Sequence, residues 1–262
     1  MKKILFYFLI FWFLVACQKS PKIEEVRVGT IAGPETELMK TAADVAKENY
    51  HLQVTIIEFS DYVIPNVALN DGSIDANMFQ HAPYLKNAMQ QHAYDFVAVA
   101  KTFIYPMGVY SKKINNLALL PDNAIVAIPN DPTNEARALL LLEKAGLIRL
   151  KEGSNENATL QSIVLNPKHL KIKEMDAASL PRVLDDTTLA VINTNYAIPA
   201  GLVPNKDALL LEDKGSLYAN LLVVNKKDVS SKKIEELIKA LHSEAVKEKA
   251  NDLFQGQAVS AW

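Results

Sequence analysis

The 262-residue sequence has one cysteine, Cys17, so no disulfide bond can form within the chain. Its five histidines are scattered and show none of the spacings typical of a metal site. The GxSxG, GxGxxG, P-loop and HExxH motifs are also missing. We therefore expect neither a metal nor a cofactor, and the missing motifs favour a binding protein over an enzyme.

The positive and negative charges of the chain are also nearly balanced. Lys and Arg number 28 and Asp and Glu number 30, which gives a formal net charge of −2. Loss of Lys2 and Lys3 with a cleaved signal would bring this charge to −4, two positive charges fewer. Surfaces that bind nucleic acids are usually basic, so we expect no nucleic-acid partner. Hydrophobic residues make up 49% of the chain, which is enough for a sizeable core.

The longest apolar run covers residues 4–15 and follows Lys2 and Lys3. It is shorter than the roughly 20 residues of a membrane-spanning helix, and its charged start is typical of a secretory signal. The run leads into LVAC (14–17), which resembles the lipobox of bacterial lipoproteins, where the chain is cut before a cysteine that is then lipidated. We expect a signal peptide at residues 1–16, a lipidated tether at 17–25, and a lipid-anchored protein of the bacterial cell envelope that faces the periplasm. A cleaved signal followed by a chance cysteine is the alternative.

Short apolar strands alternate with helical segments along the rest of the chain. Asp131 suits a helix N-cap, Pro132 suits the first helical position, and Gly146 suits the end of the same helix. The alternation predicts an α/β fold with largely parallel sheets. Strands are expected at residues 26–31, 52–59, 96–103, 124–130, 170–175, 188–194, 208–213 and 221–226, and helices at 36–50, 131–148 and 230–255.

One segment fits neither kind of element. DANMFQHAPYL (75–85) brings Phe79, His81 and Tyr84 together around Pro83. The segment is too polar for a core strand and too aromatic for a plain loop. It is therefore a candidate binding segment.

The segment belongs to FSDYVIPNVALNDGSIDANMFQHAPYL (59–85), which resembles the signature of the methionine-binding lipoproteins of ABC importers, the NlpA family. The resemblance continues through TFIYPMGVYSKKI, AIPNDPTNEARALLLLEKAGLI, LPRVLDD, AVINTNYA and YANLLVVNKKD to the terminal GQAVSAW. It implies a two-lobed periplasmic-binding-protein fold (a Venus flytrap), with lobe one at residues 26–109 plus 222–262 and lobe two at 110–221. It also implies that the lobes bind a small ligand between them, L-methionine or D-methionine. The protein would deliver this ligand to an ABC permease and its ATPase, which import it.

The resemblance and the chemistry of an amino acid together indicate which residues bind the ligand. A closed cleft removes both charged ends of the ligand from water, so each end needs a partner. Arg137 is expected to pair with the carboxylate, near the start of a helix whose dipole also favours an anion. Asn193 and Asn220 match ligand-contacting asparagines of the family, and their amides could accept from the ammonium or donate to the carboxylate. Sulfur–aromatic contacts to the thioether are expected from a pocket of Tyr62, Phe79, His81, Tyr84 and Tyr105.

Plainer interpretations stay open for several of these residues. Arg137 could be a surface arginine, and the two asparagines could cap strand ends. Without the resemblance, Phe79 would be a core residue and His81 a capped loop histidine, and Tyr84 could pack inward as part of a helix. The main alternative function is the same family with another small amino acid or a dipeptide as ligand, and the other is an enzyme or an adhesin-like surface lipoprotein. The sequence separates neither L- from D-methionine nor methionine from its sulfoxide. Gln18 after Cys17 leaves both the inner and the outer membrane open.

Overall fold

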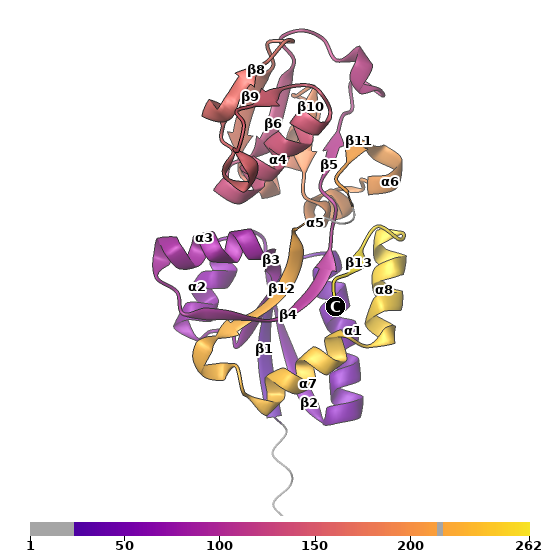
Figure 1. The fold of residues 1–262 in the computed structure, drawn as a ribbon. Coiled ribbons are helices and arrows are strands. Elements are labelled where there is room, and N and C mark those ends of the chain that lie inside the picture. Colours follow the sequence, from indigo (N-terminus) through magenta and orange to yellow (C-terminus); the bar gives the residue numbers. More distant parts are fainter. Residues whose placement is uncertain (1–23, 214–216) are drawn as a thin grey trace, which may run out of the picture.

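The computed structural model of the protein describes residues 24–213 and 217–262. The predicted signal peptide, Cys17 and tether residues 18–23 lie outside the described residues. The described chain forms two lobes, one above the other in Figure 1, each built on its own β-sheet. None of the helices in these ranges is both long and apolar enough to cross a membrane.

The first lobe is a six-stranded sheet with helices on both faces. Its strands are β1 (Glu24–Ile31), β2 (Leu52–Phe59), β3 (Ala76–His81), β4 (Phe96–Ile104), β12 (Ala219–Asn225) and β13 (Val259–Ser260), in the order β13-β4-β12-β3-β1-β2. Its helices are α1 (Pro34–Tyr50), α2 (Ile64–Asp71), α3 (Ala82–His92), α7 (Lys232–Leu241) and α8 (Glu244–Phe254). Buried side chains of α1, α7 and α8 form one apolar cluster with the sheet, and those of α2 and α3 form another.

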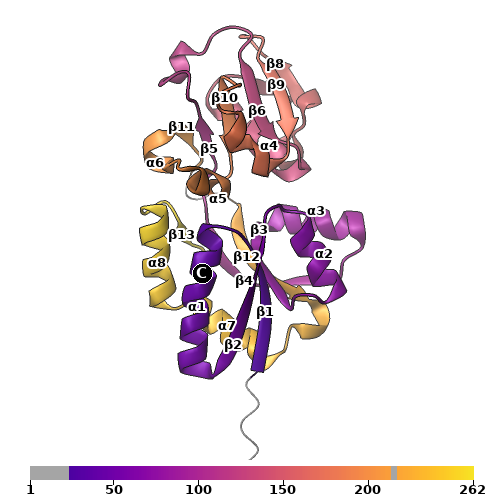
Figure 2. The same cartoon turned by 180° about the vertical axis from the view of Figure 1, so that it is seen from behind.

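The second lobe contains a five-stranded sheet. Its strands are β5 (Gly108–Tyr110), β6 (Ile125–Pro129), β9 (Lys171–Met175), β10 (Leu189–Ile192) and β11 (Ala208–Leu211), in the order β11-β5-β10-β6-β9. Helix α4 (Pro132–Lys144) packs in one apolar cluster, and residues 177–183 and α5 (Thr194–Ala197) pack in another. Helix α6 (Pro204–Asp207) precedes β11, and β7 (Arg149–Leu150) pairs with β8 (Ile163–Leu165) in a separate sheet. Figure 2, the view from behind, shows α5 between the two lobes.

Both large sheets are mixed, so the prediction of largely parallel sheets is wrong. Only β1–β2, β1–β3, β6–β9 and β6–β10 are parallel pairs. Strand β12 runs antiparallel to both of its neighbours, β3 and β4. This strand arrives from the other lobe rather than through a helical crossover on its own sheet, and only such a crossover would favour parallel pairing.

The chain passes from the first sheet to the second between β4 and β5, and it returns between β11 and β12. Residues 24–104 and 219–260 supply the strands of the first sheet, and residues 108–211 supply those of the second. The lobe boundaries predicted at 109/110 and 221/222 fall inside β5 and β12.

Residues 76–81 form a fully buried strand, so the expectation that this segment is too polar for the core is wrong. Three side-chain amides bond one another there. The Asn66 oxygen accepts from Asn77 at 2.9 Å and from Gln80 at 2.7 Å, and the Asn66 nitrogen donates to Gln80 at 3.0 Å. Because these amides satisfy one another, the polar residues fit inside the protein at little cost.

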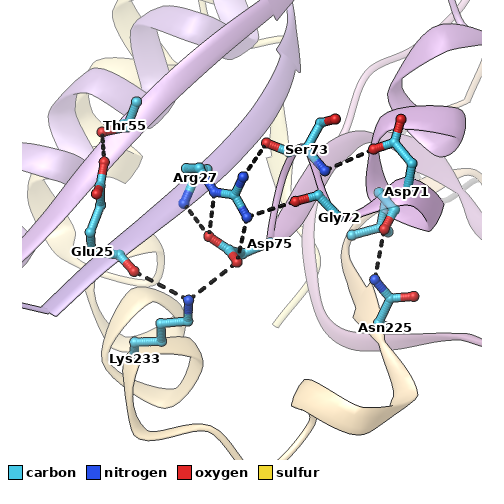
Figure 3. A network of polar contacts seen from close by, with 10 residues as sticks. Glu25, Arg27, Thr55, Asp71, Gly72, Ser73, Asp75, Asn225 and Lys233 are labelled. Atoms are coloured by element: carbon cyan, nitrogen blue, oxygen red, sulfur yellow. Dashed lines mark hydrogen bonds and ion pairs between the residues drawn. The ribbon is translucent and has the colours of Figure 1, made fainter.

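A second polar network joins β1 to the turn between α2 and β3 (Figure 3). The Arg27 backbone N–H donates to the Asp75 carboxylate at 2.8 Å, and the Arg27 guanidinium donates to the carbonyls of Gly72 and Ser73 at 2.8 Å. Lys233 of α7 contacts the same carboxylate at 3.3 Å. The network fixes β3, which forms the first half of the candidate binding segment, against its neighbouring strand.

Candidate ligand-binding site

Both lobes contribute residues to one cavity. Residues of β3, α3 and β12 in the first lobe line it together with residues of α4 and α5 in the second. All eight predicted ligand-binding residues line this cavity: Tyr62, Phe79, His81, Tyr84, Tyr105, Arg137, Asn193 and Asn220. Gln80, Asn134, Thr194 and Asn195 complete the lining.

An aromatic wall comes from the first lobe. The ring centroid of Tyr62 lies 5.9 Å from that of Phe79 and 6.0 Å from that of Tyr84. The Tyr84 hydroxyl donates to the Tyr62 carbonyl at 2.8 Å, and the Tyr62 hydroxyl donates to Asn195 of α5 at 2.7 Å. The wall is therefore tied to the second lobe and offers polarizable aromatic rings to an apolar side chain.

His81 joins the wall to the polar part of the cavity. Its Nδ1 accepts from the Tyr84 backbone N–H at 3.2 Å, and its Nε2 lies 3.3 Å from Oδ1 of Asn134. Burial and the nearby Arg137 charge lower the pKa of His81 to about 3. The imidazole is thus neutral near pH 7, with its proton on Nε2.

Arg137 is buried, and segments of both inter-lobe connections hold its guanidinium. Its Nε donates to Glu212 at 2.9 Å, and its Nη2 donates to Glu212 and to the Tyr105 carbonyl. The Tyr218 ring centroid lies 4.4 Å from the central guanidinium carbon. Nη1 takes part in none of these bonds. Sequence reasoning missed Glu212, because no local pattern links residues that lie 75 positions apart.

The helix that carries Arg137 begins as predicted, with Asp131 as N-cap and proline in the first turn. The end is also as predicted, since Gly146 follows the C-cap with a φ of +70°. However, Asp131 accepts from the Asn134 backbone N–H at 3.0 Å, so the N-terminus already holds a carboxylate. Arg137 lies in the second turn. The guanidinium is therefore the group placed to attract an anion, and a contribution from the helix dipole stays a prediction.

The two predicted asparagines present oxygen atoms. Asn220 Nδ2 donates to Glu35 at 2.6 Å and to the Phe79 carbonyl at 3.1 Å, which uses both of its N–H groups. Asn193 Nδ2 donates to Asn134 at 2.9 Å, and its Oδ1 is buried with no hydrogen-bond partner among the described residues. Accepting from an ammonium group is therefore the role that fits Asn220, whereas Asn193 has both an oxygen and a second N–H that could face a ligand.

Glu35 is a fully buried carboxyl in the first turn of α1. Its Oε1 accepts from Asn220, and its Oε2 has no partner among residues 24–213 and 217–262. Burial raises the pKa of Glu35 to about 8, although the hydrogen bond from Asn220 opposes the rise. Sequence reasoning missed this residue, because an acidic residue at a helix start usually lies in solvent.

The fold and the cavity define a two-lobed substrate-binding protein of the periplasmic type. The family model described as NlpA lipoprotein matches residues 26–262, and the chain belongs to this family. The chain is 47% identical over 252 residues to the D-methionine-binding lipoprotein MetQ of Escherichia coli K12. The match covers 95% of this chain and 93% of the relative.

Two solved structures are similar in fold and sequence. An ABC transporter periplasmic substrate-binding protein from Coxiella burnetii has a TM-score of 0.88 and 57% identity, and covers 90% of this chain and 100% of its own. A nutrient binding protein from Burkholderia cenocepacia bound to methionine has a TM-score of 0.88 and 51% identity, with the same coverage.

Proposed function

We propose that the protein is the substrate-binding component of an ABC importer and that it captures methionine in the inter-lobe cavity. The observation that carries the proposal is the combination, in one cavity, of a guanidinium, two amide oxygens and an aromatic wall. The name of the Escherichia coli relative and the methionine in the Burkholderia cenocepacia structure support it. The protein then hands the ligand to a membrane permease and its ATPase, and it performs no catalysis.

Each part of the ligand has a partner of matching chemistry. The carboxylate binds Arg137, because a guanidinium offers several donors to one anion. The ammonium group donates to the oxygens of Asn193 and Asn220. The side chain lies against Tyr62, Phe79, His81, Tyr84 and Tyr105, where burial contributes about 1.5–3 kcal/mol and sulfur–ring contacts about 0.3–1.5 kcal/mol.

The family also supports the proposed location. A lipoprotein anchored through Cys17 would hold the binding lobes at the membrane surface on the periplasmic side, where a permease can receive the ligand. Each CH₂ of an acyl chain that enters the bilayer contributes about 0.8 kcal/mol, so two or three chains anchor the protein stably.

Ligand binding is tested with protein that has been unfolded and refolded to remove any methionine bound during expression. Addition of L-methionine should raise the melting temperature, because a ligand that binds only the folded state stabilises it. D-methionine, methionine sulfoxide and a dipeptide are compared in the same assay. An unchanged melting curve with both methionine enantiomers would overturn the proposal, and a shift with the dipeptide alone would favour the alternative ligand.

A further inference from the structure

Glu35 has no positive partner in the described part of the chain. No ion pair reaches its carboxyl there, and its Oε2 has no hydrogen bond. A buried carboxylate without a counter-charge is costly, so such a group usually keeps its proton. The ion pair nearest to the cavity, Arg137 with Glu212, is already complete and does not include Glu35.

The groups that face Glu35 are neutral. Asn220 of β12 donates to it, and Asn195 of α5 is also in contact. The Glu35 charge also acts on the hydroxyls of Tyr62, Tyr105 and Tyr196, which keep their protons because burial raises the pKa of each. Nothing in this set supplies a positive charge to Glu35.

The cavity is the route by which a positive charge could come close. Asn220 lies between Glu35 and the cavity, with its nitrogen bonded to Glu35 and its oxygen left for a ligand. If an ammonium group binds this oxygen, only the side-chain amide of Asn220 separates it from the Glu35 carboxyl. At such a separation inside a protein, a positive charge stabilises the carboxylate form.

We propose that Glu35 carries a proton in the ligand-free protein and releases it to solvent when the ligand's ammonium group binds beside Asn220. The O–H bond of Glu35 breaks, the proton passes to the buffer, and the carboxylate becomes the counter-charge of the ammonium. This inference rests on the proposed function. It makes a primary ammonium a required part of a tightly bound ligand, and it makes affinity rise with pH.

The size of the effect follows from linkage. Since the pKa of Glu35 is about 8 without ligand, nearly a full proton is available for release at pH 7. Affinity for methionine should then rise by up to about tenfold per pH unit between pH 6 and 8. His81, with a pKa of about 3, does not titrate in this range.

Calorimetric titration of L-methionine at pH 7, in phosphate and in Tris, counts the released protons from the dependence of the binding heat on the buffer. The wild-type protein should release roughly 0.5–1 proton per ligand. Glu35→Gln should bind without proton release. Glu135→Gln is the matched control, because Glu135 is a second buried carboxyl with a raised pKa, about 7, that does not line the cavity. It should release the same number of protons as the wild type.

A second measurement uses the wild-type protein alone. The methionine analogue without the amino group should bind with no proton release, whether or not Glu35→Gln folds. Methionine binding that releases no proton in the wild type, or equal release in Glu35→Gln, would overturn this inference and leave the proposed function standing. Complete absence of methionine binding would overturn both.

Discussion

The carboxylate of Glu212 accepts from the guanidinium of Arg137 at Nε and Nη2. The Arg137 side chain is buried, at 5% exposure, and the Glu212 side chain is partly buried, at 13%. Glu212 also accepts from the Met107 backbone N–H at 3.2 Å and donates its own N–H to the Met107 carbonyl at 2.9 Å. The guanidinium therefore has one fixed orientation before any ligand arrives, with Nη1 outside these contacts.

Glu212→Gln should weaken methionine binding by roughly tenfold or more, because a hydrogen bond between charged groups contributes about 1.5–3 kcal/mol. The neighbouring Asp213→Asn is the matched control. Asp213 pairs with Lys144 of α4, the helix that carries Arg137, but the Asp213 side chain is 80% exposed. Exposed pairs contribute little, so this variant should bind like the wild type. Equal affinities of the two variants, measured by calorimetry, would show that Glu212 does not orient Arg137.

Arg137→Ala should cost about 2–5 kcal/mol of methionine affinity, since a buried ligand carboxylate loses its cation. The variant should also melt at a lower temperature without ligand, because the partly buried Glu212 carboxylate loses its positive partner. Melting followed by circular dichroism separates this loss of stability from the loss of binding measured by calorimetry. Unchanged affinity in the folded variant would place the ligand elsewhere.

Asn220→Ala should reduce methionine affinity by about 1–3 kcal/mol, because the ammonium loses an acceptor in a site with little water. Asn225→Ala tests whether the effect is specific to the cavity. Asn225 lies on the same strand and donates to the Leu69 carbonyl at 2.7 Å, but it does not line the cavity. This control should lose stability and keep its affinity. A comparable loss of affinity in both variants would indicate a general effect on β12.

His81 should make the protein less stable in acid. Its pKa falls from an ordinary value of 6.5 to about 3 on folding, so the unfolded state binds more protons between these values. Stability is then complete above about pH 6.5 and declines as the pH falls toward 3. His81→Gln should show a smaller drop in urea stability between pH 7 and pH 5 than the wild type. His92→Gln, at an exposed position, should keep the wild-type drop.

Cys17→Ala should release the protein from membranes when it is expressed in its native form. The reason is the loss of the acyl chains that the thiol would carry. Fractionation followed by immunoblotting checks the outcome. Persistent membrane attachment of the variant would rule out this anchor.

The candidate site was predictable where a local sequence motif carries it. The segment at 59–85 pointed to Tyr62, Phe79, His81 and Tyr84, and the structure brings these side chains to one cavity with Arg137. Their contacts with a ligand stay a prediction. The α/β class also followed from the alternation of strands and helices, together with the cap and the end of α4.

The missing parts depend on residues far apart in the chain. Glu35 meets Asn220 across 185 positions, and neither residue has a neighbour in sequence that signals the contact. The burial of β3 was missed for a related reason, since Asn77 and Gln80 look unfit for a core until Asn66 is seen to pair with them. Mixed strand directions were missed because hydrophobic periodicity reports burial and says nothing about the direction of a neighbouring strand.

The two connections between the sheets meet at Arg137, through the Tyr105 carbonyl on one and Glu212 on the other. Any rotation of one lobe against the other must bend these same connections, so the guanidinium sits close to the pivot. A given rotation about this pivot would move the far ends of both lobes much further than it would move the guanidinium or a small molecule bound beside it. A small ligand bound at the pivot could in this way change the relative orientation of the two outer lobe surfaces, which a membrane partner would contact.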